Sequence, residues 1–329
     1  MSPSRIILTC GEPAGIGPEL APQALAAGVP VVWMGDPAHL PPGTPWQAVE
    51  RPSDPVGVGV LPVLAHPFPA AATPGTPDPA NAAAVIEVIA RAVALARSGA
   101  AGGICTLPIS KQALIDGAGF AFPGHTEYLA HLAGGVDVAM MLASTTVNPP
   151  CRVVSATIHI ALDAVPAAFT PDLLTRATLT THDALVRDFG IRAPRIAVAG
   201  LNPHAGEGGR MGRAEVDWMA PLLGALRQRG LDLLGPLPAD TMFHAPARAQ
   251  WDAAVCAYHD QALIPIKTLD FAGGVNVTLG LPFVRTSPDH GTAFDIAGRG
   301  IADPSSMLAA LRMAWNMASA RASGDVATL

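Results

Sequence analysis

Charged residues are scarce in this 329-residue chain: Asp, Glu, Lys and Arg make up 14% of it, against about 25% in an average soluble domain. Such low charge is typical of strands covered on both faces, or of a large buried subunit interface. The formal net charge is −6, whereas a phosphate backbone demands a basic protein face. We therefore expect no nucleic-acid partner.

Cysteine is scarce as well, and no two cysteines form a CxxC pair. The four are Cys10, Cys105, Cys151 and Cys256. A disulfide scaffold and a cysteine–metal site are both poor interpretations of so wide a spacing, and a reducing compartment is expected.

The opening SPSRIILTC has too short an apolar run for a signal peptide. The long uncharged stretch at residues 55–77 is interrupted by proline, which excludes a membrane helix there. We expect a soluble, cytoplasmic protein with no membrane partner.

Short apolar segments alternate with helical patterns along the chain, which at this length is expected to form two lobes. The expected strands are residues 5–9, 29–34, 103–106, 140–143, 153–159, 195–200 and 253–258. The expected helices are residues 18–27, 82–98, 125–133, 170–189, 215–229 and 305–322. Residues 36–80 form a proline-rich connection with short extended pieces such as 56–64. This alternation predicts an α/β fold with mostly parallel sheets.

Three histidines lie in short segments of unusual composition. They are His159 in SATIHIALDAVP, His204 in LNPHAGEGG and His259 in AYHDQALIPIK, 45 and 55 residues apart. These spacings exclude a zinc finger and a helical HExxH site. Each histidine lies at or just beyond the carboxyl end of an expected strand, where parallel sheets bind ligands. Three imidazoles leave a metal with an open coordination position. The alternative is that each is an ordinary core or loop histidine.

The segment FPGHTEYLA places His125 and Thr126 at the start of an expected helix. Free backbone N–H groups and the threonine hydroxyl could form an anion pocket there. Lys111 in PISK is a candidate for the same pocket. The alternative is an ordinary helix cap, for which threonine is a favoured residue.

Three polar side chains follow His259 in segments that we interpret as loop-flanked strands. Lys267, Asn276 and Arg285 offer a cation, an amide and a guanidinium. Together they could hold a phosphate or a carboxylate, although a single Lys or Arg is usually a surface charge.

Two glycine-containing segments are candidates for contact with a nucleotide. GEPAGIGPE follows an expected strand but is not GxGxxG, so it is either part of a cofactor site or a tight strand-to-helix turn. DHGTAFDIAGRGIADPSS begins with the ionisable Asp289 and His290 and could wrap a nucleotide.

These motifs together resemble one known family. GEPAGIGPE, PISK, FPGHTEYLA, LNPHAGEGG, GPLPADTMF, YHDQALIPIK and GVNVTLGLPFVRTSPDHGTAFDIAG occur in this order between about residues 7 and 310. They resemble the 4-hydroxythreonine-4-phosphate dehydrogenases (the PdxA family) of bacterial pyridoxal phosphate biosynthesis. HGTAFDIAGRGIADP also resembles the coenzyme loop of isopropylmalate and isocitrate dehydrogenases.

The resemblance implies two α/β/α lobes with mostly parallel sheets and an interlobe cleft, as in isocitrate and isopropylmalate dehydrogenases. The first lobe would comprise residues 1–125 and 275–329 and carry both termini and the NAD loop. The second would comprise residues 126–274, with the metal ligands and the interface of a homodimer whose active site lies at that interface. The metal (Zn, Mg or Co) would be held by His159, His204 and His259, with His259 supplied by the opposite subunit.

The resemblance also implies ligand contacts and a reaction. Substrate-binding residues would be His125, Thr126, Lys267, Asn276 and Arg285. NAD, or NADP, would lie along His290, Gly291, Thr292 and Asp295. Lys111 and Asp240 are both candidates for the general base, as is a bound water. The expected reaction is oxidation of 4-phosphohydroxy-L-threonine to a β-keto acid, which loses CO2 to give 3-amino-2-oxopropyl phosphate.

Alternatives to this substrate stay open at the level of sequence. Residues 36–80 look compressed, and residues 270–274 lack a basic residue that family members often carry. A sister dehydrogenase would act on a four-carbon sugar-acid phosphate or an aromatic cis-dihydrodiol. A protein of another class would be an acyl- or phosphotransferase on the same fold.

Overall fold

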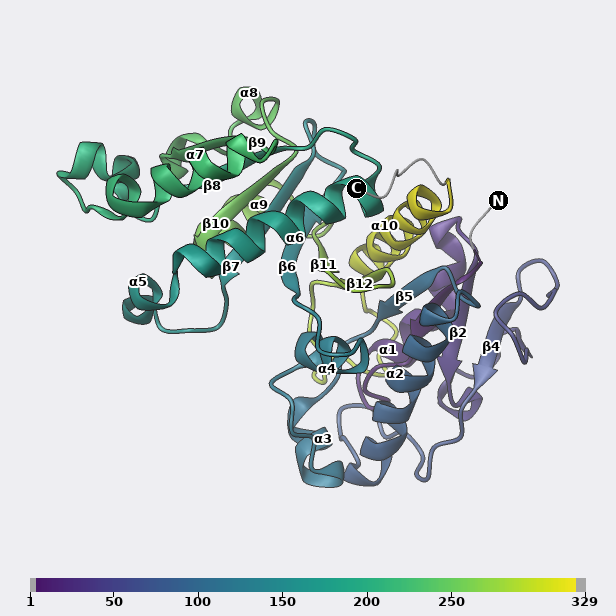
Figure 1. The fold of residues 1–329 in the computed structure, drawn as a ribbon. Coiled ribbons are helices and arrows are strands. Elements are labelled where there is room, and N and C mark those ends of the chain that lie inside the picture. The colour runs from purple at the N-terminus through teal and green to yellow at the C-terminus, as the bar shows by residue number, and fades with distance from the viewer. Residues whose placement is uncertain (1–3, 324–329) are drawn as a thin grey trace. The chain divides into compact units, whose positions relative to one another are not determined.

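The chain forms two compact units in the computed structural model, which describes residues 4–323. Residues 4–136 with 281–323 form the first unit, and residues 137–280 form the second (Figure 1). The boundaries thus lie after residues 136 and 280, whereas the sequence analysis places them after residues 125 and 274. The predicted position of residues 324–329 in the first lobe lies outside the described residues.

Packing explains where these boundaries fall. Helix α4 (His125–Leu132) contacts helix α2 (Ala82–Arg97) and so belongs to the first unit. Strand β11 (Val275–Leu279) pairs along its length with β6 (Ala139–Ser144) and so belongs to the second.

The first unit is built on a parallel sheet with the strand order β3-β4-β2-β1-β5-β12. Every residue of β1, β2, β5 and β12 is buried, as expected for central strands covered on both faces. Helices α2 and α10 pack on these strands (Figure 1). The elements of this unit are β1 (Ile6–Thr9), α1 (Gly17–Leu20), β2 (Val31–Gly35), β3 (Trp46–Ala48), β4 (Leu61–Ala65), α2, β5 (Gly103–Thr106), α3 (Lys111–Ala118), α4, β12 (Arg285–Pro288) and α10 (Ser305–Ala322).

One described segment, Pro79–Arg97, is long and apolar enough to cross a membrane by length and composition alone. It contains α2, whose apolar face packs against β1, β2 and β5. This packing is that of a core helix.

The second unit has a mixed sheet with the order β11-β6-β7-β10-β8-β9. Strand β6 runs antiparallel to both of its neighbours, and the remaining pairs are parallel. Helices α6 and α9 pack on β6, β7 and β10. The elements are β6, β7 (Cys151–Thr157), α5 (Val165–Ala168), α6 (Pro171–Phe189), β8 (Arg195–Ala199), α7 (Ala220–Gln228), β9 (Asp232–Leu237), α8 (Ala245–Arg248), β10 (Ala253–Tyr258), α9 (His259–Leu269) and β11.

Most of the predicted elements are present, so the predicted α/β class with mostly parallel strands is confirmed. The helix predicted at residues 215–229 is instead a π-helical turn, Glu215–Met219, followed by α7. Four helices were not predicted: α3, α5, α8 and α9. Helix α9 contains Pro265, which lacks the N–H that a helix interior requires and so conceals the helix in the sequence.

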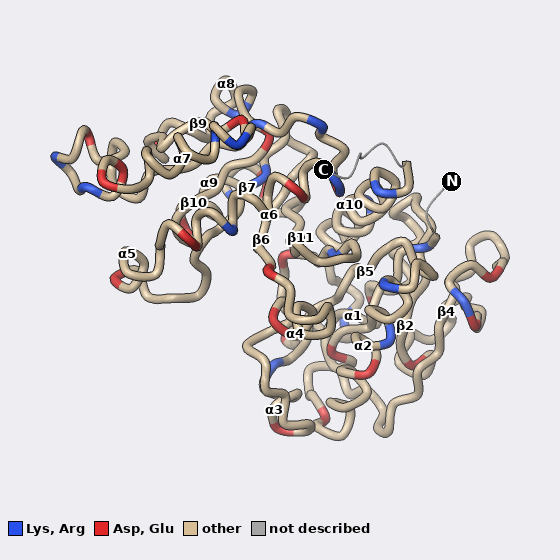
Figure 2. The backbone as a smooth tube through the Cα atoms, viewed as in Figure 1, with Lys and Arg blue, Asp and Glu red and all other residues tan. Residues whose placement is uncertain are grey.

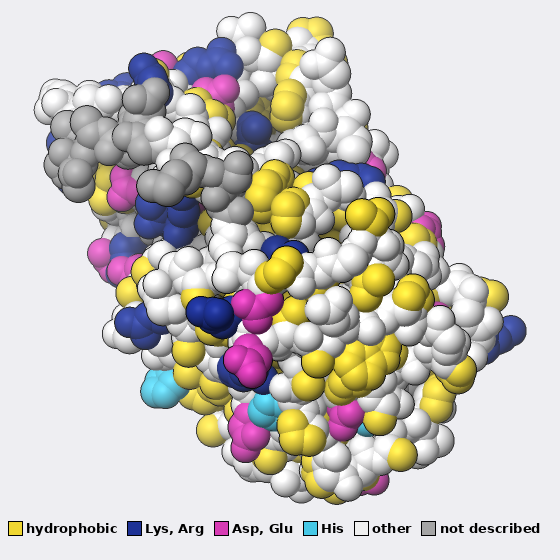
Figure 3. Space-filling view, turned by 90° about the vertical axis from the view of Figure 1, so that its right-hand side faces the viewer, with side chains coloured by type: hydrophobic (Ala, Val, Ile, Leu, Met, Phe, Trp, Pro, Cys, Tyr) yellow, Lys and Arg dark blue, Asp and Glu magenta, His cyan; other side chains and the backbone are white. Residues whose placement is uncertain are grey.

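The low content of charged residues is visible on the surface of the protein. Figure 2 shows Lys and Arg interspersed with Asp and Glu along both units, and Figure 3 shows a face where many hydrophobic side chains lie between small groups of charged ones. All four cysteines are buried and free, as the absence of a disulfide pattern predicts.

Candidate functional site

The three histidines follow three neighbouring strands of the second unit. Strands β7, β10 and β8 lie side by side and parallel. His159 comes two residues after β7, His259 directly after β10, and His204 five residues after β8. The carboxyl ends of parallel strands meet at one edge of a sheet. The prediction that all three histidines follow strands at that edge is confirmed.

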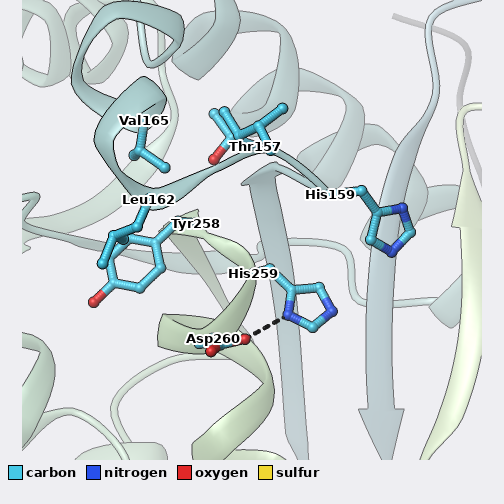
Figure 4. Close-up of a pocket in the computed structure, with 8 residues that line it drawn as sticks. Thr157, His159, Leu162, Val165, Tyr258, His259 and Asp260 are labelled. Atoms are coloured by element: carbon cyan, nitrogen blue, oxygen red, sulfur yellow. Dashed lines mark hydrogen bonds and ion pairs between the residues drawn. The ribbon is translucent and has the colours of Figure 1, made fainter.

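His159 and His259 lie next to each other in a pocket at this edge (Figure 4). Their ring centroids are 5.7 Å apart. His159 has a φ of 54°, which turns the chain away from β7 and explains why the strand ends at Thr157 rather than at residue 159. The other lining residues are Thr157, Ile160, Leu162, Val165, Tyr258 and Asp260.

The side chain of Asp260 contacts a ring nitrogen of His259. Nδ1 of His259 lies 2.7 Å from Oδ1 of Asp260 (Figure 4). Because a carboxylate can only accept, this contact places the proton of the neutral imidazole on Nδ1, and Nε2 then keeps its lone pair. A carboxylate on the second ring nitrogen is the usual partner of a metal-binding histidine. With metal–nitrogen bonds of about 2.0–2.1 Å, two imidazoles on one ion have ring centroids within roughly 6 Å of each other, so this pair fits a divalent metal.

His204 does not join the other two histidines in this pocket. It lies in the turn Pro203–Gly209, exposed to solvent. Within residues 4–323 of one chain, no three His, Cys, Asp or Glu side chains lie close enough together to hold a metal ion. One chain therefore brings together two of the three predicted ligands, and the supply of His259 by a second subunit stays a prediction.

Asp240 lies at the same edge of the second unit. It follows β9, the neighbour of β8, in the turn Ala239–Thr241, which contacts the turn Pro203–Gly209. Its side chain is exposed. This position near His204 is compatible with the predicted role as a base.

In the first unit, Arg285 is a buried cation on β12, only 3% exposed. Its Nε and Nη2 atoms donate to the Thr106 hydroxyl at 3.2 and 2.8 Å. Burial lowers the pKa of Arg285 to about 10, so the guanidinium remains charged at neutral pH. A buried cation of this kind is a strong binder of anions.

His125 is close enough to Arg285 to be affected by its charge. Burial, and secondarily the charge of Arg285, lowers the pKa of His125 to about 3. Its Nε2 atom is buried and has no hydrogen-bond partner in the described structure. His125 is therefore neutral at pH 7 and has a ring nitrogen available to a ligand. It opens α4, and Thr126 is the next residue of that helix.

Lys267 and Asn276 lie in the second unit. Lys267 is in helix α9, two turns after His259, with Nζ 5.6 Å from the ring centroid of Phe271. The prediction that Lys267 lies in a loop-flanked strand is therefore wrong, because α9 continues through Pro265. Asn276 is in β11, and its Oδ1 is buried without a hydrogen-bond partner among the described residues.

The predicted base Lys111 lies in the first unit. It is the first residue of α3, which Ser110 caps by accepting a hydrogen bond from the amide of Ala113 at 3.3 Å. Its side chain is exposed, and α3 follows β5 at the carboxyl end of that strand.

The segment predicted to bind NAD follows β12 and packs against the glycine turn. The amide of Ile16 donates to the carbonyl of Thr292 at 3.1 Å, and a Cβ at Gly15 would lie 2.8 Å from that carbonyl oxygen. Nδ1 of His290 contacts the carbonyl of Gly291 at 2.9 Å, while its Nε2 is buried without a partner in the described structure. Asp295 is exposed. GEPAGIGPE is thus a tight strand-to-helix turn that also supports this segment.

Two residues at these sites, Asp260 and Glu12, were not singled out from the sequence. Asp260 directly follows His259, and that adjacency is a signal that could have found it. Glu12 is 4% exposed, and burial raises the pKa of its carboxyl group. It accepts a hydrogen bond from the amide of Ala14 at 3.1 Å inside the glycine turn.

Comparison with known proteins gives consistent matches. The family model described as "Pyridoxal phosphate biosynthetic protein PdxA" matches residues 36–314. A 4-hydroxythreonine-4-phosphate dehydrogenase of Paracoccus denitrificans (strain Pd 1222) is 73% identical over 316 residues, covering 96% of this chain and 98% of the relative. A crystal structure of 4-hydroxythreonine-4-phosphate dehydrogenase from Klebsiella pneumoniae has a TM-score of 0.88 and 38% identity, covering 96% of this chain and 98% of that one. The structure of a terephthalate 1,2-cis-dihydrodiol dehydrogenase from Burkholderia xenovorans LB400 has a TM-score of 0.68 and 30% identity, with coverage of 95% and 98%.

Proposed function

The chain belongs to the PdxA family of pyridoxal phosphate biosynthetic proteins, and we propose that it is the dehydrogenase that oxidises 4-phosphohydroxy-L-threonine. Its family makes it an oxidoreductase, which sets aside the acyl- or phosphotransferase alternative. The observation that carries the choice of substrate is the 73% identity to a 4-hydroxythreonine-4-phosphate dehydrogenase across 96% of this chain. Overall, the secondary alcohol is oxidised to a β-keto acid, which loses CO2 to give 3-amino-2-oxopropyl phosphate.

The substrate phosphate is held by Arg285, Lys267 and the start of α4. Arg285 supplies a buried guanidinium, which matches a phosphate in both charge and geometry. His125 is neutral at pH 7, so it contributes a hydrogen bond from its unpartnered Nε2 side rather than a charge. Thr126 and Asn276 supply further polar contacts. Anchoring the phosphate positions the reacting carbon.

His159, His204 and His259 hold one divalent ion, Zn, Mg or Co. When bound, this ion supplies Lewis-acid stabilisation of negative charge on the reacting oxygen. Asp260 keeps the proton of His259 on Nδ1 and so leaves Nε2 available as the ligand atom. Imidazole suits several divalent metals, so the residues alone do not distinguish among these three.

NAD, or NADP, lies along His290, Gly291, Thr292 and Asp295, where it supplies the hydride acceptor. The carbonyl of Thr292, held by the amide of Ile16, fixes this segment against the glycine turn. Lys111 and Asp240, both exposed, are the candidates for taking the hydroxyl proton.

The active site lies at the interface of a homodimer, in the cytoplasm. Ile264 and Phe271 line one surface pocket together with His259. This supports a subunit contact there, since contiguous exposed apolar side chains mark interaction surfaces. Ile264 of α9 is 62% exposed, Phe271 is 79% exposed and Leu162 of the histidine pocket is 68% exposed.

The test is NAD(P)H formation with a panel of substrates. The panel contains 4-phosphohydroxy-L-threonine, D-erythronate 4-phosphate, D-threonate 4-phosphate and an aromatic cis-dihydrodiol, each before and after chelation and metal add-back. Metal-dependent turnover that prefers the hydroxythreonine phosphate supports the proposal. A preference for a sugar-acid phosphate, or for the dihydrodiol as in the terephthalate relative, overturns the substrate and keeps the oxidoreductase class.

A further inference from the structure

The turn that carries His204 has a backbone conformation that its own residues disfavour. Six consecutive residues have positive φ: His204 (51°), Ala205 (48°), Gly206 (76°), Glu207 (42°), Gly208 (65°) and Gly209 (93°). For residues other than glycine this conformation costs roughly 1–2 kcal/mol each. Such a turn persists only if the surrounding structure holds it in place.

The buried carboxylate of Glu215 holds this turn. Glu215 is 2% exposed, and carboxylates are rarely buried so fully without partners. Its Oε1 accepts from the amide of Asn202 at 2.7 Å, and its Oε2 accepts from Nδ2 of the same residue at 3.0 Å. A Cβ at Gly206 would lie 2.6 Å from Oε2, and one at Gly200 would lie 3.2 Å from Oε1. The carboxylate therefore fills the inside of the turn and fixes its path.

Glu215 begins the π-helical turn Glu215–Met219. Such turns are rare and occur frequently at functional sites. Because this turn is wider than an α-helical turn, the position of Glu215 does not follow the regular residue spacing of helix α7, which comes next.

A second side chain, Gln261, connects the strand ends that precede the histidines. Its Oε1 accepts from the amide of Ala257 in β10 at 2.7 Å, and its Nε2 donates to the carbonyl of Gly200, just after β8, at 2.8 Å. The hydroxyl of Thr157 in β7 donates to the carbonyl of Ala257 at 2.8 Å. The ends of β7, β10 and β8 are thus tied together immediately before His159, His259 and His204.

We propose that Glu215 and Gln261 are positioning residues for the metal site. Glu215 fixes the direction of the His204 turn, and Gln261 fixes the distance between the ends of β10 and β8. Neither side chain is a ligand, and both act through the histidines. This inference rests on the metal-binding role proposed above.

Two conservative variants remove these contacts. Glu215→Gln keeps an oxygen for the amide of Asn202 but sets an NH2 group against Nδ2 of that residue. Gln261→Glu keeps the acceptor for Ala257 but sets a carboxylate oxygen against the carbonyl of Gly200. Glu207→Gln, on the exposed side of the same turn, and Gln228→Glu, exposed at the end of α7, are the matched controls.

The first measurement is backbone hydrogen exchange in the metal-free protein, which depends on the turn alone. We expect faster exchange at residues 202–210 in Glu215→Gln and not in Glu207→Gln. The second is Co2+ titration followed by the visible absorption of the bound ion. We expect roughly 10–100-fold weaker binding in Glu215→Gln and in Gln261→Glu, as for other residues that support metal ligands, and unchanged binding in the controls.

The outcomes separate this inference from the proposed function. Unchanged exchange at residues 202–210 in Glu215→Gln overturns the role of Glu215, whether or not metal binds. Wild-type Co2+ affinity in both variants overturns the positioning of the metal site. Wild-type protein that binds no Co2+ overturns the proposed metal site itself. If Glu215→Gln fails to fold, the Co2+ titration of Gln261→Glu still decides whether the tie between the ends of β10 and β8 sets the affinity for the metal.

Discussion

Nδ1 of His259 lies 2.7 Å from Oδ1 of Asp260. Both residues open helix α9, so the contact is made within a single helical turn. The carboxylate thereby orients the imidazole ring and makes its Nε2 the better electron donor. The behaviour of His259 as a ligand is therefore expected to depend on the neighbouring carboxylate of Asp260.

Replacing Asp260 by Asn tests this dependence. The amide cannot stabilise the Nδ1 proton as a carboxylate does, so Co2+ or Zn2+ affinity should fall by roughly 10–100-fold. Isothermal titration calorimetry measures the change. Asp163→Asn is the control, because it removes the same charge from an exposed position beside Leu162 of the pocket. Equal affinities in the two variants would show that the hydrogen bond is irrelevant to metal binding.

Subunit complementation decides which chain supplies His259. His159→Ala and His259→Ala are each expected to be inactive. If His259 serves the partner's site, mixed dimers contain one intact set of ligands, and random reassortment of a twofold dimer returns roughly a quarter of wild-type activity. If His259 serves the site of its own chain, beside His159, the mixture stays inactive. The measurement is NADH formation after the two variants are unfolded together and refolded.

Gly15→Ala is expected to weaken NAD binding. The added Cβ would lie 2.8 Å from the carbonyl oxygen of Thr292, so the predicted NAD segment must shift. We expect a higher KM for NAD and a loss of about 1–3 kcal/mol in the free energy of unfolding, as for other overpacked sites. Gly224→Ala in α7 meets no atom within 4 Å and should instead stabilise the protein by up to about 1 kcal/mol. Urea unfolding and NAD titration check both variants.

Stability should fall in mild acid because of His125. Its pKa is about 3 in the folded protein, against 6.5 for the free side chain. Between these values the unfolded chain binds a proton that the folded chain does not, so stability decreases as the pH falls from 6.5 towards 3. The slope is at most about 1.4 kcal/mol per pH unit. Urea unfolding at pH 7 and pH 5 should show a smaller loss in His125→Asn than in wild type, whereas His131→Asn, at an exposed position of the same helix, should behave as wild type.

The fold was largely predictable because its central strands are short runs of apolar residues separated by clear helices. The alternation of strands and helices also predicted that His159, His204 and His259 lie at one edge of the sheet, because the carboxyl ends of parallel strands meet at the same edge. Helix α9 was not predictable in this way, because Pro265 interrupts the pattern that would reveal it. Lys267 was misplaced for that reason alone.

The residues that shape the metal site could not be read from the sequence. Glu215 meets Asn202 only because the intervening turn is left-handed at six residues. Gly206 and Gly208 permit that turn, but neither indicates which carboxylate it encloses. Contacts such as Gln261 to Gly200 join segments 61 residues apart and require the three-dimensional order of the strands.

The discontinuity of the first unit has a consequence for synthesis on the ribosome. Its sheet is completed by β12, which pairs with β5, and by α10, which packs on both strands. Both elements are made after the whole of the second unit, which occupies residues 137–280. The end of β5 at Thr106 and the start of β12 at Arg285 are separated by 178 residues. The edge of β5 therefore stays unpaired while these residues are translated, and unpaired strand edges are prone to aggregate. The second unit can therefore complete its fold first, and a chain stopped before residue 285 is expected to be released with an exposed β5 edge.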